Sequence, residues 1–414
     1  MRIIGILLLF LFFIPLVGNA VTHSEEIKAA FIRDGDLWIS QTGKEVKVTK
    51  SGNTYNPSWS PDGKWLLFQH DVDSPNPPYG KWSEIWVYEV EKKQLKKIFY
   101  NGSNPKWAPN ENIIAFKNEN ILNVCNLKHF FNVALGVDDY NWLPDGSGFI
   151  LSSSAQLRPN GWTQPKLYKK LLDQNWEEIN PYSGAEVLFT IPKEVQKNGE
   201  AIQSIQASSF QFSPSQKWVS FIISPTASIS MDANMLSVIT AEGEQFQPID
   251  EVIFGVGSPK WAPMKEILAY ISGTGRIVFG FKNKDLKLKE LPTSVPITPE
   301  NFAELDFTWV DDQNLITSRV IEADWSNDIA KQPLPSLYKI NWVTGQQQKM
   351  IDTPKNYGDY QPQFIASAQA LIWLRKRSLQ DESGDIWISN LSGENKKKWI
   401  ENVNEIAVYS SKRP

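Results

Sequence analysis

The stretch that decides the fold is NPSWSPDGKWLLF at residues 56–68. Six further copies of this phrase follow it: NPKWAPNENIIAF (104–116), DYNWLPDGSGFIL (139–151), SFQFSPSQKWVSF (209–221), SPKWAPMKEILAY (258–270), DFTWVDDQNLITS (306–318) and QPQFIASAQALIW (361–373). The copies begin at intervals of about 35 to 70 residues that cluster near 48, which is the range of a four-stranded propeller blade. The sequence therefore predicts a repeat fold.

Each position of the phrase has a structural reason. Proline near the start suits a short innermost strand, and Ser60-Pro61-Asp62-Gly63 is a typical turn sequence. The apolar run after the turn suits a strand that neighbouring blades cover on both faces. An aromatic residue at the fourth position suits the wedge between adjacent twisted sheets. The seven copies have Trp59, Trp107, Trp142, Phe212, Trp261, Trp309 and Phe364 there.

The two ends of the chain predict how the ring closes. Residues 27–49 read as second, third and fourth strands without a first strand, whereas residues 404–409 read as a first strand with no blade after it. We expect this last strand to complete the N-terminal blade and so to remove two sheet edges. The prediction is an all-β chain with one propeller domain, residues 27–414, and eight four-stranded blades. Seven blades, or six, are the alternatives, because the copy at 361–373 has lost its turn Pro and Gly.

The repeats resemble those of the TolB-type, WD40-like (PD40) β-propellers, whose signature is Trp, then Ser-Pro-Asp-Gly, then an apolar strand. The resemblance covers nearly all of residues 27–414. It implies that Trp59, Pro61, Asp62 and Gly63 are scaffold residues. It also implies a role in binding partners of the cell envelope. TolB itself has a six-bladed propeller, so this sequence departs from it in the number of repeats.

Residues 1–20 have the pattern of an export signal. A basic residue, Arg2, precedes an apolar run from Ile3 to Val17, and small residues precede a cleavage site after Ala20. An uncleaved anchor is the alternative, although the run is slightly short of the ~20 residues needed to span a bilayer. We expect a secreted or extracytoplasmic monomer with no stable membrane span after cleavage.

Charge and cysteine content narrow the function classes. The formal net charge is -4, which is a poor match for nucleic acid. Cys125 is the one cysteine, so no internal disulfide can form, and its apolar surroundings in ILNVCNL predict a buried strand residue. We therefore expect stability to come from packing and ring closure.

The connections between the second and third strands should all emerge on one face of the ring. The sequence predicts tight connections at 34–35, 118–120 and 273–275, the last followed by a third strand at 276–279. It predicts long loops at 70–82, 154–165, 224–234, 321–335 and 377–384. Lengthening on one face of a rigid frame is typical of a binding surface.

These loops contain the candidate ligand-binding residues Tyr79, Trp82, Trp162, Trp325, Asp324, Asp328 and Asp381, with Asp71, Asp73 and Glu382 beside them. Aromatic side chains ringed by polar groups suit a protein, a peptide or a saccharide. The alternative for each aromatic is that it folds back to cap its own blade.

No catalytic residue, metal ligand set or cofactor is predicted. The sequence has three histidines and shows no Gly-x-Ser-x-Gly elbow or phosphate-binding loop. His70 beside Asp71 and Asp73 is the one local cluster of titratable groups, and a solvated loop is its simplest interpretation. The leading hypothesis is a non-enzymatic binding or scaffold propeller. The alternative is a propeller hydrolase or lyase with an acidic, Ca²⁺-assisted site in the central channel.

Overall fold

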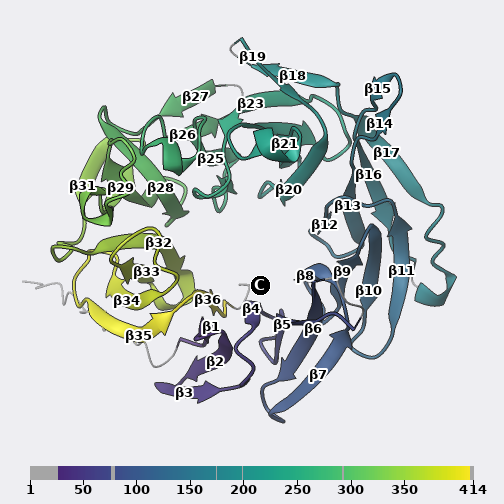
Figure 1. Ribbon diagram of the computed structural model, residues 1–414, viewed down its shortest axis with the longest axis horizontal. Helices are drawn as coiled ribbons and strands as arrows, with labels where there is room; N and C mark the ends of the chain where they lie inside the picture. Colours follow the sequence, from purple (N-terminus) through teal and green to yellow (C-terminus); the bar gives the residue numbers. More distant parts are fainter. Residues whose placement is uncertain (1–26, 76–79, 174, 198, 291–292, 411–414) are drawn as a thin grey trace, which may run out of the picture.

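The structure, a computed structural model, describes residues 27–410 except 76–79, 174, 198 and 291–292. In this part of the chain the strands form eight four-stranded antiparallel sheets arranged as a ring (Figure 1). The protein is a β-propeller with eight blades, as predicted. No helix in the described residues is both long enough and apolar enough to cross a membrane. The predicted export signal, residues 1–20, lies outside the described residues.

The blades follow one another along the chain, and each consists of four strands ordered from the centre of the ring outward. Blades 1 to 4 are β36 (Glu405–Val408), β1 (Ala29–Arg33), β2 (Asp36–Gln41), β3 (Lys44–Lys47); β4 (Thr54–Trp59), β5 (Trp65–Asp73), β6 (Lys81–Glu89), β7 (Gln94–Phe99); β8 (Ser103–Trp107), β9 (Ile114–Asn118), β10 (Ile121–Cys125), β11 (Phe130–Leu135); and β12 (Tyr140–Trp142), β13 (Gly148–Ser153), β16 (Lys166–Leu171), β17 (Ala185–Thr190). Blades 5 to 8 are β20 (Gln206–Phe212), β21 (Trp218–Ser224), β22 (Asn234–Thr240), β23 (Gln247–Val252); β24 (Lys260–Trp261), β25 (Ile267–Ser272), β26 (Asp285–Glu290), β27 (Thr293–Pro296); β28 (Phe302–Trp309), β29 (Asn314–Ile321), β30 (Ser336–Asn341), β31 (Gln346–Lys349); and β32 (Gly358–Ile365), β33 (Ala370–Lys376), β34 (Gly384–Asn390), β35 (Lys397–Val403).

The last strand closes the ring as predicted. β36 pairs antiparallel with β1, with Phe31 opposite Ile406. The backbone N–H of Asn404 also donates to the carbonyl of Ile32 at 2.8 Å. The N-terminal and C-terminal segments therefore form one sheet, blade 1, and the inner edge of β1 is paired with β36.

Tryptophans of the repeat join neighbouring blades. The indole N–H of Trp107 donates to the carbonyl of Ser58 in the preceding blade at 3.2 Å. Trp309 makes the same bond to Lys260 at 3.1 Å. Trp59, Trp142 and Trp261 donate to Ala407, Lys106 and Gln211. The predicted wedge role is confirmed, and each bond gives a buried or partly buried indole N–H an acceptor.

The turn of the repeat has the predicted chemistry. Asp62 accepts hydrogen bonds from the Ser60 hydroxyl and the Lys64 backbone N–H at 2.7 and 3.0 Å. Gly63 has φ of 67°, and a Cβ there would come within 2.6 Å of the Tyr409 ring. Glycine is required at this turn for its backbone conformation and for the close approach of the C-terminal segment.

Blade 6 differs from the prediction. Residues 276–279 were expected to form its third strand, but Ile277–Phe279 is a 3₁₀ turn (η2) and the strand is Asp285–Glu290. In Asp285–Glu290 apolar and polar residues alternate as a strand requires, and Leu286 and Leu288 are buried, whereas Phe279 is 65% exposed. The connection predicted as tight at 273–275 therefore extends over residues 273–284.

Two extra hairpins explain the long interval of 70 residues between the third copy of the phrase, at 139–151 in blade 4, and the fourth, at 209–221. β14 (Leu157–Arg158) pairs with β15 (Gly161–Trp162) within the connection between β13 and β16. β18 (Glu194–Lys197) pairs with β19 (Glu200–Gln203) between blades 4 and 5. Both insertions leave the four-stranded sheets intact, so the repeat lengthens without breaking the ring.

Blade 2 has longer strands than expected. β5 and β6 continue their pairing to Asp73 and Lys81, so His70, Asp71 and Trp82 lie on strands rather than in a loop. The prediction of a loop over all of 70–82 was therefore wrong. Cys125, predicted to be a buried strand residue, is 3% exposed at the end of β10.

Candidate functional site

Four connections on one face of the ring lie next to one another in blades 5 to 8. They link the second strand of each blade to the third and comprise residues 225–233, 273–284, 322–335 and 377–383. We call these four segments the loop platform. Three of them contain a short helical turn: α1 (Ala227–Ser230), η2 (Ile277–Phe279) and η3 (Ile329–Lys331).

An ion pair ties the connection of blade 5 to that of blade 6. The Arg276 guanidinium donates to both carboxylate oxygens of Asp232, with Nε–Oδ1 at 2.8 Å and Nη2–Oδ2 at 2.9 Å. The backbone N–H of Gly275 donates to the Asp232 carbonyl at 2.8 Å. The hydrogen bonds from Arg276 hold the pKa of Asp232 below its ordinary value. Two-point contact of this kind sets the orientation of both loops.

Backbone pairing ties the connection of blade 6 to that of blade 7. The backbone N–H of Phe281 donates to the carbonyl of Ala323 at 2.7 Å, and the two residues form an isolated antiparallel bridge. The Phe281 ring is 1% exposed and stacks on Trp325, with 5.9 Å between ring centroids. Lys282 and Asp324 form an ion pair beside this bridge.

A buried lysine shapes the connection of blade 6 from within. Lys284 is 1% exposed and donates through Nζ to the carbonyls of Thr274 and Lys282 at 2.6 and 3.1 Å. Burial lowers the pKa of Lys284. The side chain closes residues 274–282 into a compact loop.

The connections of blades 6, 7 and 8 share one apolar cluster. Ile277, Trp325 and Leu379 each pack against the same group of buried residues, which includes Phe281 and Tyr360. The platform is therefore continuous from blade 5 to blade 8.

A pocket of about 360 Å³ opens at the inner edge of the platform. Its apolar side is formed mainly by Val256, Leu305 and two platform residues, Ile277 and Leu379. Its polar side chains are Ser258, Lys260, Asp306, Ser318, Tyr360, Gln361 and Lys376. We call this cavity the platform pocket. Blades 6, 7 and 8 and the segment that joins blade 5 to blade 6 all contribute to it.

Hydrogen bonds hold the two lysines of the platform pocket in place. Lys260 Nζ lies 3.2 Å from Asp306 Oδ1. Lys376 Nζ donates to the carbonyls of Leu379 and Asp381 at 3.1 and 2.9 Å. An ammonium group has three N–H donors, so Lys376 retains one beyond these two bonds.

Burial changes the acid–base character of two groups in the platform pocket. Burial raises the pKa of the Tyr360 hydroxyl, and the charges of Asp381 and Asp359 raise it further. Burial also lowers the pKa of Lys376. A tyrosine hydroxyl is protonated at physiological pH with or without this shift, so Tyr360 can donate a hydrogen bond.

Gln361 enters the platform pocket from a strained position. The pairing of β32 with β33 shifts register between Tyr360 and Gln363, and Gln361 has φ of 50°. The same register shift with a positive φ recurs in β4, β8 and β20, so this bulge belongs to the repeat, and here it directs the side chain of Gln361 to the platform pocket.

Large apolar side chains on the platform remain exposed to solvent around the pocket. They are Ile229 (56%), Met231 (50%), Val278 (47%), Phe279 (65%) and Ile329 (51%). None of these five side chains lines the platform pocket, and exposed apolar side chains gathered on neighbouring loops are typical of a surface that binds a partner.

The predicted aromatic residues do not form one group. Trp82 lies in blade 2, and its ring packs against that of Tyr100 with 5.4 Å between the ring centroids. Trp162 lies in the β14–β15 hairpin of blade 4, opposite Leu157. Trp325 belongs to the platform, but it stacks on Phe281 and donates its indole N–H to Asn327 at 3.0 Å. Tyr79 lies outside the described residues.

The predicted acidic residues act mainly within their own loops. Asp328 accepts the Ala330 N–H at the start of η3, and Asp381 accepts the N–H groups of Arg377 and Ser378. Asp71 accepts from the Tyr55 hydroxyl at 2.9 Å, and the His70 ring lies 3.1 Å from the Ser51 hydroxyl. In the described residues no three His, Cys, Asp or Glu side chains are grouped so that they could hold a metal ion.

Sequence reasoning missed the residues that connect the platform. Arg276, Phe281 and Lys284 were assigned to a strand or left without a role, because the run RIVF looks like a strand by itself. One signal was available: the alternating segment DLKLKE at 285–290 is the better strand. The lysines of the platform pocket had no distinguishing local pattern.

No protein-family model matches the sequence, and no curated protein matches it. Several solved structures are similar. A eukaryotic initiation factor is 13% identical with a TM-score of 0.57, over 93% of this chain and 88% of that one. Dipeptidyl peptidase 4 of Porphyromonas gingivalis is 11% identical with a TM-score of 0.55, over 91% of this chain and 58% of that one. TolB from Acinetobacter baumannii is 15% identical with a TM-score of 0.38, over 66% of this chain and 64% of that one.

These similarities concern the fold. The chain spans less than two thirds of the length of TolB and of the peptidase. At these identities the likeness to the initiation factor and to the peptidase shows a shared architecture alone.

Proposed function

We propose that this chain is an exported, non-enzymatic binding propeller of the cell envelope or extracellular space, which holds a protein or peptide on its loop platform. Export is supported by the signal pattern of residues 1–20. Binding is supported by the platform, where four neighbouring blades each have an extended connection between the second and third strands.

One observation carries the proposal: the four platform connections are tied to one another and still expose apolar side chains. Contacts such as Arg276 with Asp232 and Phe281 with Ala323 hold the loops before any partner arrives. A surface held in this way loses little conformational entropy on binding. Phe279 and Met231 remain available to a partner because the ties bury neither side chain.

The platform pocket suits one anchoring side chain of a peptide. Its volume of about 360 Å³ lies at the lower end of the range of ligand pockets, and its wall combines Ile277 and Leu379 with the donors of Lys376 and Tyr360. The apolar part of a peptide side chain can contact Ile277 and Leu379, while a peptide carbonyl accepts a hydrogen bond from Lys376 or Tyr360. Apolar anchors in such pockets provide most of the affinity of protein interfaces.

Peptide display tests the proposal directly. A random peptide library is selected against the mature protein, and enriched peptides are measured against Phe279→Ser and Lys376→Met variants by calorimetry. We expect affinity to fall at least about tenfold in each variant. Phe130→Ser is the matched control, because Phe130 is a half-exposed aromatic on the outer strand of blade 3. Failure to enrich any peptide, or equal loss in the control, would count against the platform as the binding surface.

The enzymatic alternative can be tested on the same protein. A panel of glycosides, lactones and peptide substrates is incubated with and without Ca²⁺. Turnover that survives Phe279→Ser and depends on carboxylates of the ring would replace the binding proposal with a hydrolase or lyase.

A further inference from the structure

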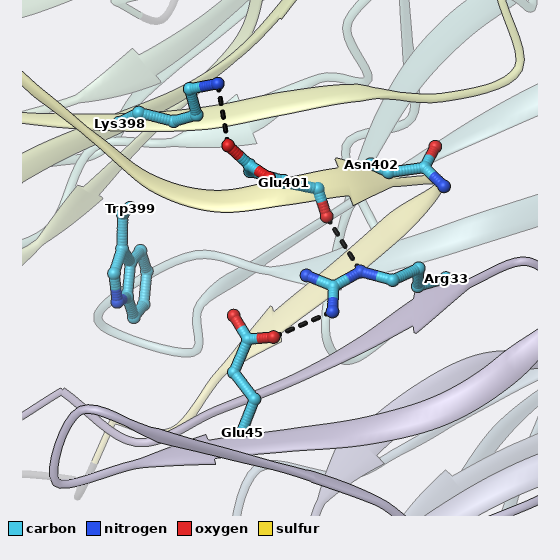
Figure 2. Close-up of a pocket in the computed structure, with 6 residues that line it drawn as sticks. All are labelled: Arg33, Glu45, Lys398, Trp399, Glu401 and Asn402. Carbon is cyan, nitrogen blue, oxygen red and sulfur yellow. Dashed lines mark hydrogen bonds and ion pairs between the residues drawn. The ribbon is translucent and has the colours of Figure 1, made fainter.

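A second cavity lies where blade 8 meets blade 1, next to the last connection of the platform, since the Ser383 hydroxyl donates to Oδ1 of its lining residue Asn402 at 2.7 Å. Figure 2 shows its six lining residues: Arg33, Glu45, Lys398, Trp399, Glu401 and Asn402. It has a volume of about 540 Å³ and opens between the outer strands β3 and β35. We call it the seam groove, because the ring closes at this junction.

Opposite charges alternate along the seam groove. Arg33 donates through Nη1 to Glu45 Oε2 at 2.7 Å and through Nε to the Glu401 carbonyl at 2.8 Å. Lys398 Nζ lies 2.8 Å from Glu401 Oε1 and 3.2 Å from Oδ2 of Asp385, a residue behind the lining. The lining therefore contains two cationic and two anionic side chains, with no formal excess of either sign. Each of these groups also has hydrogen-bonding capacity beyond the bonds it makes in the groove.

Trp399 is the unusual residue of this groove. Figure 2 shows its side chain pointing from β35 toward β3, where Glu45 points back toward it. The side chain is half-buried and rests against apolar residues of blade 8. The tryptophans at the blade junctions donate their indole N–H to a carbonyl, such as Trp107 to Ser58. Among the described residues Trp399 has neither a hydrogen-bond partner for its indole nor a ring partner.

We propose that the seam groove binds a neutral saccharide. A sugar ring has an apolar face that can lie on the indole and hydroxyl groups that each donate and accept a hydrogen bond. Such hydroxyls match a lining in which donors of Arg33 and Lys398 alternate with acceptors of Glu45 and Glu401. An anionic ligand would meet two carboxylates, and a cationic ligand would meet a guanidinium and an ammonium group, so the balanced charge favours a neutral ligand.

This inference is independent of the peptide proposed for the platform. The seam groove and the platform pocket have no lining residue in common. Saccharide binding at the seam can therefore be present or absent whatever binds to the platform.

Calorimetry with defined oligosaccharides tests the inference. Maltohexaose, cellohexaose and chitohexaose are titrated into the mature protein. We expect at least one to bind and its affinity to fall about tenfold or more in Trp399→Ala, the scale for loss of a central aromatic anchor. Trp399→Phe should retain most of the affinity, because a flat apolar face remains.

Two further variants distinguish a loss of sugar binding from a folding defect. Glu45→Gln removes a charge from a partly exposed position without creating a cavity, and it should weaken binding while the melting temperature stays unchanged. Phe130→Ala, on the outer strand of blade 3, should bind the sugar as the wild type does. The inference is wrong if no hexaose binds, if Trp399→Ala and Glu45→Gln both bind normally, or if a sulfated hexasaccharide binds at this groove more tightly than the neutral ones.

Discussion

The long connections of blades 5 to 8 and those of blades 2 and 4 differ in how they are supported. In blades 5 to 8 each connection contacts the next through an ion pair, a backbone bridge or a shared apolar cluster. In blades 2 and 4 the insertions are hairpin extensions, β5–β6 and β14–β15, that pair within themselves. Added length on a propeller therefore produces a continuous surface only where neighbouring loops contact each other.

The aromatic residues show the consequence. Trp325 is held between Phe281 and Asn327, so it forms part of the platform's structure. Trp162 lies on a two-residue strand opposite Leu157, which is 68% exposed. Both indoles are partly buried, but Trp325 contacts a neighbouring connection, whereas Trp162 belongs to a hairpin that pairs within itself.

The largest expected effect comes from removing the central residue of the platform. Phe281→Ala should lower the free energy of unfolding by about 3–5 kcal/mol, because it leaves a cavity beneath two connections. Chemical denaturation measures the loss. Phe279→Ala in the same connection is the control and should change stability by no more than about 0.5 kcal/mol, since that ring is exposed. Similar losses in both variants would show that the connection of blade 6 is not tied as described.

A smaller effect is expected for the residue that covers Phe281. Trp325→Ala should cost about 1–2 kcal/mol, because a half-buried ring and one hydrogen bond are lost while Phe281 keeps its bridge to Ala323. The loss should not add to that of Phe281→Ala in the double variant, since the two rings are in contact. Full additivity in the thermal or chemical melts would contradict the stacked arrangement.

Acid should loosen the platform locally. Hydrogen bonds from Arg276 depress the pKa of Asp232 in the folded state, so this ion pair contributes fully above the unfolded-state value of about 3.8. Its contribution is lost as the pH falls through the lower folded-state value. Hydrogen exchange in residues 225–233, corrected for the intrinsic pH dependence, should therefore accelerate below about pH 4.

Asp232→Asn serves as the matched control for this acid effect. The variant should exchange rapidly in residues 225–233 at neutral pH and should show no additional step on acidification. A step of the same size in the variant would assign the acid effect to another group.

The smallest effect on stability is expected in the β14–β15 hairpin of blade 4. Trp162→Ala should alter stability by no more than about 0.5 kcal/mol, because the β14–β15 hairpin lies outside the four-stranded sheet of its blade. The melting temperature provides the measurement. A loss comparable to that of Trp325→Ala would mean that the hairpin is supported in the same way as the platform.

Much of the fold could be predicted from local patterns. The blade count, the aromatic wedges and the closing strand were all present in the repeat and in the two unmatched ends of the chain. The platform was only partly predictable. The connections of blades 5, 7 and 8 were recognised by their length, whereas the connection of blade 6 was missed because Arg276 to Phe279 imitates a strand.

The sequence by itself determined the ring, because seven blades repeat one phrase and the two end segments complete the eighth. The residues of the phrase interact mainly with their own blade and with the same positions of the next. Only the tertiary structure decided which loops support one another. Asp232 and Arg276 are 44 residues apart, and their ion pair exists because consecutive blades place equivalent connections side by side. Contacts of this kind depend on how neighbouring blades are set in space, and they leave no periodic pattern in the chain.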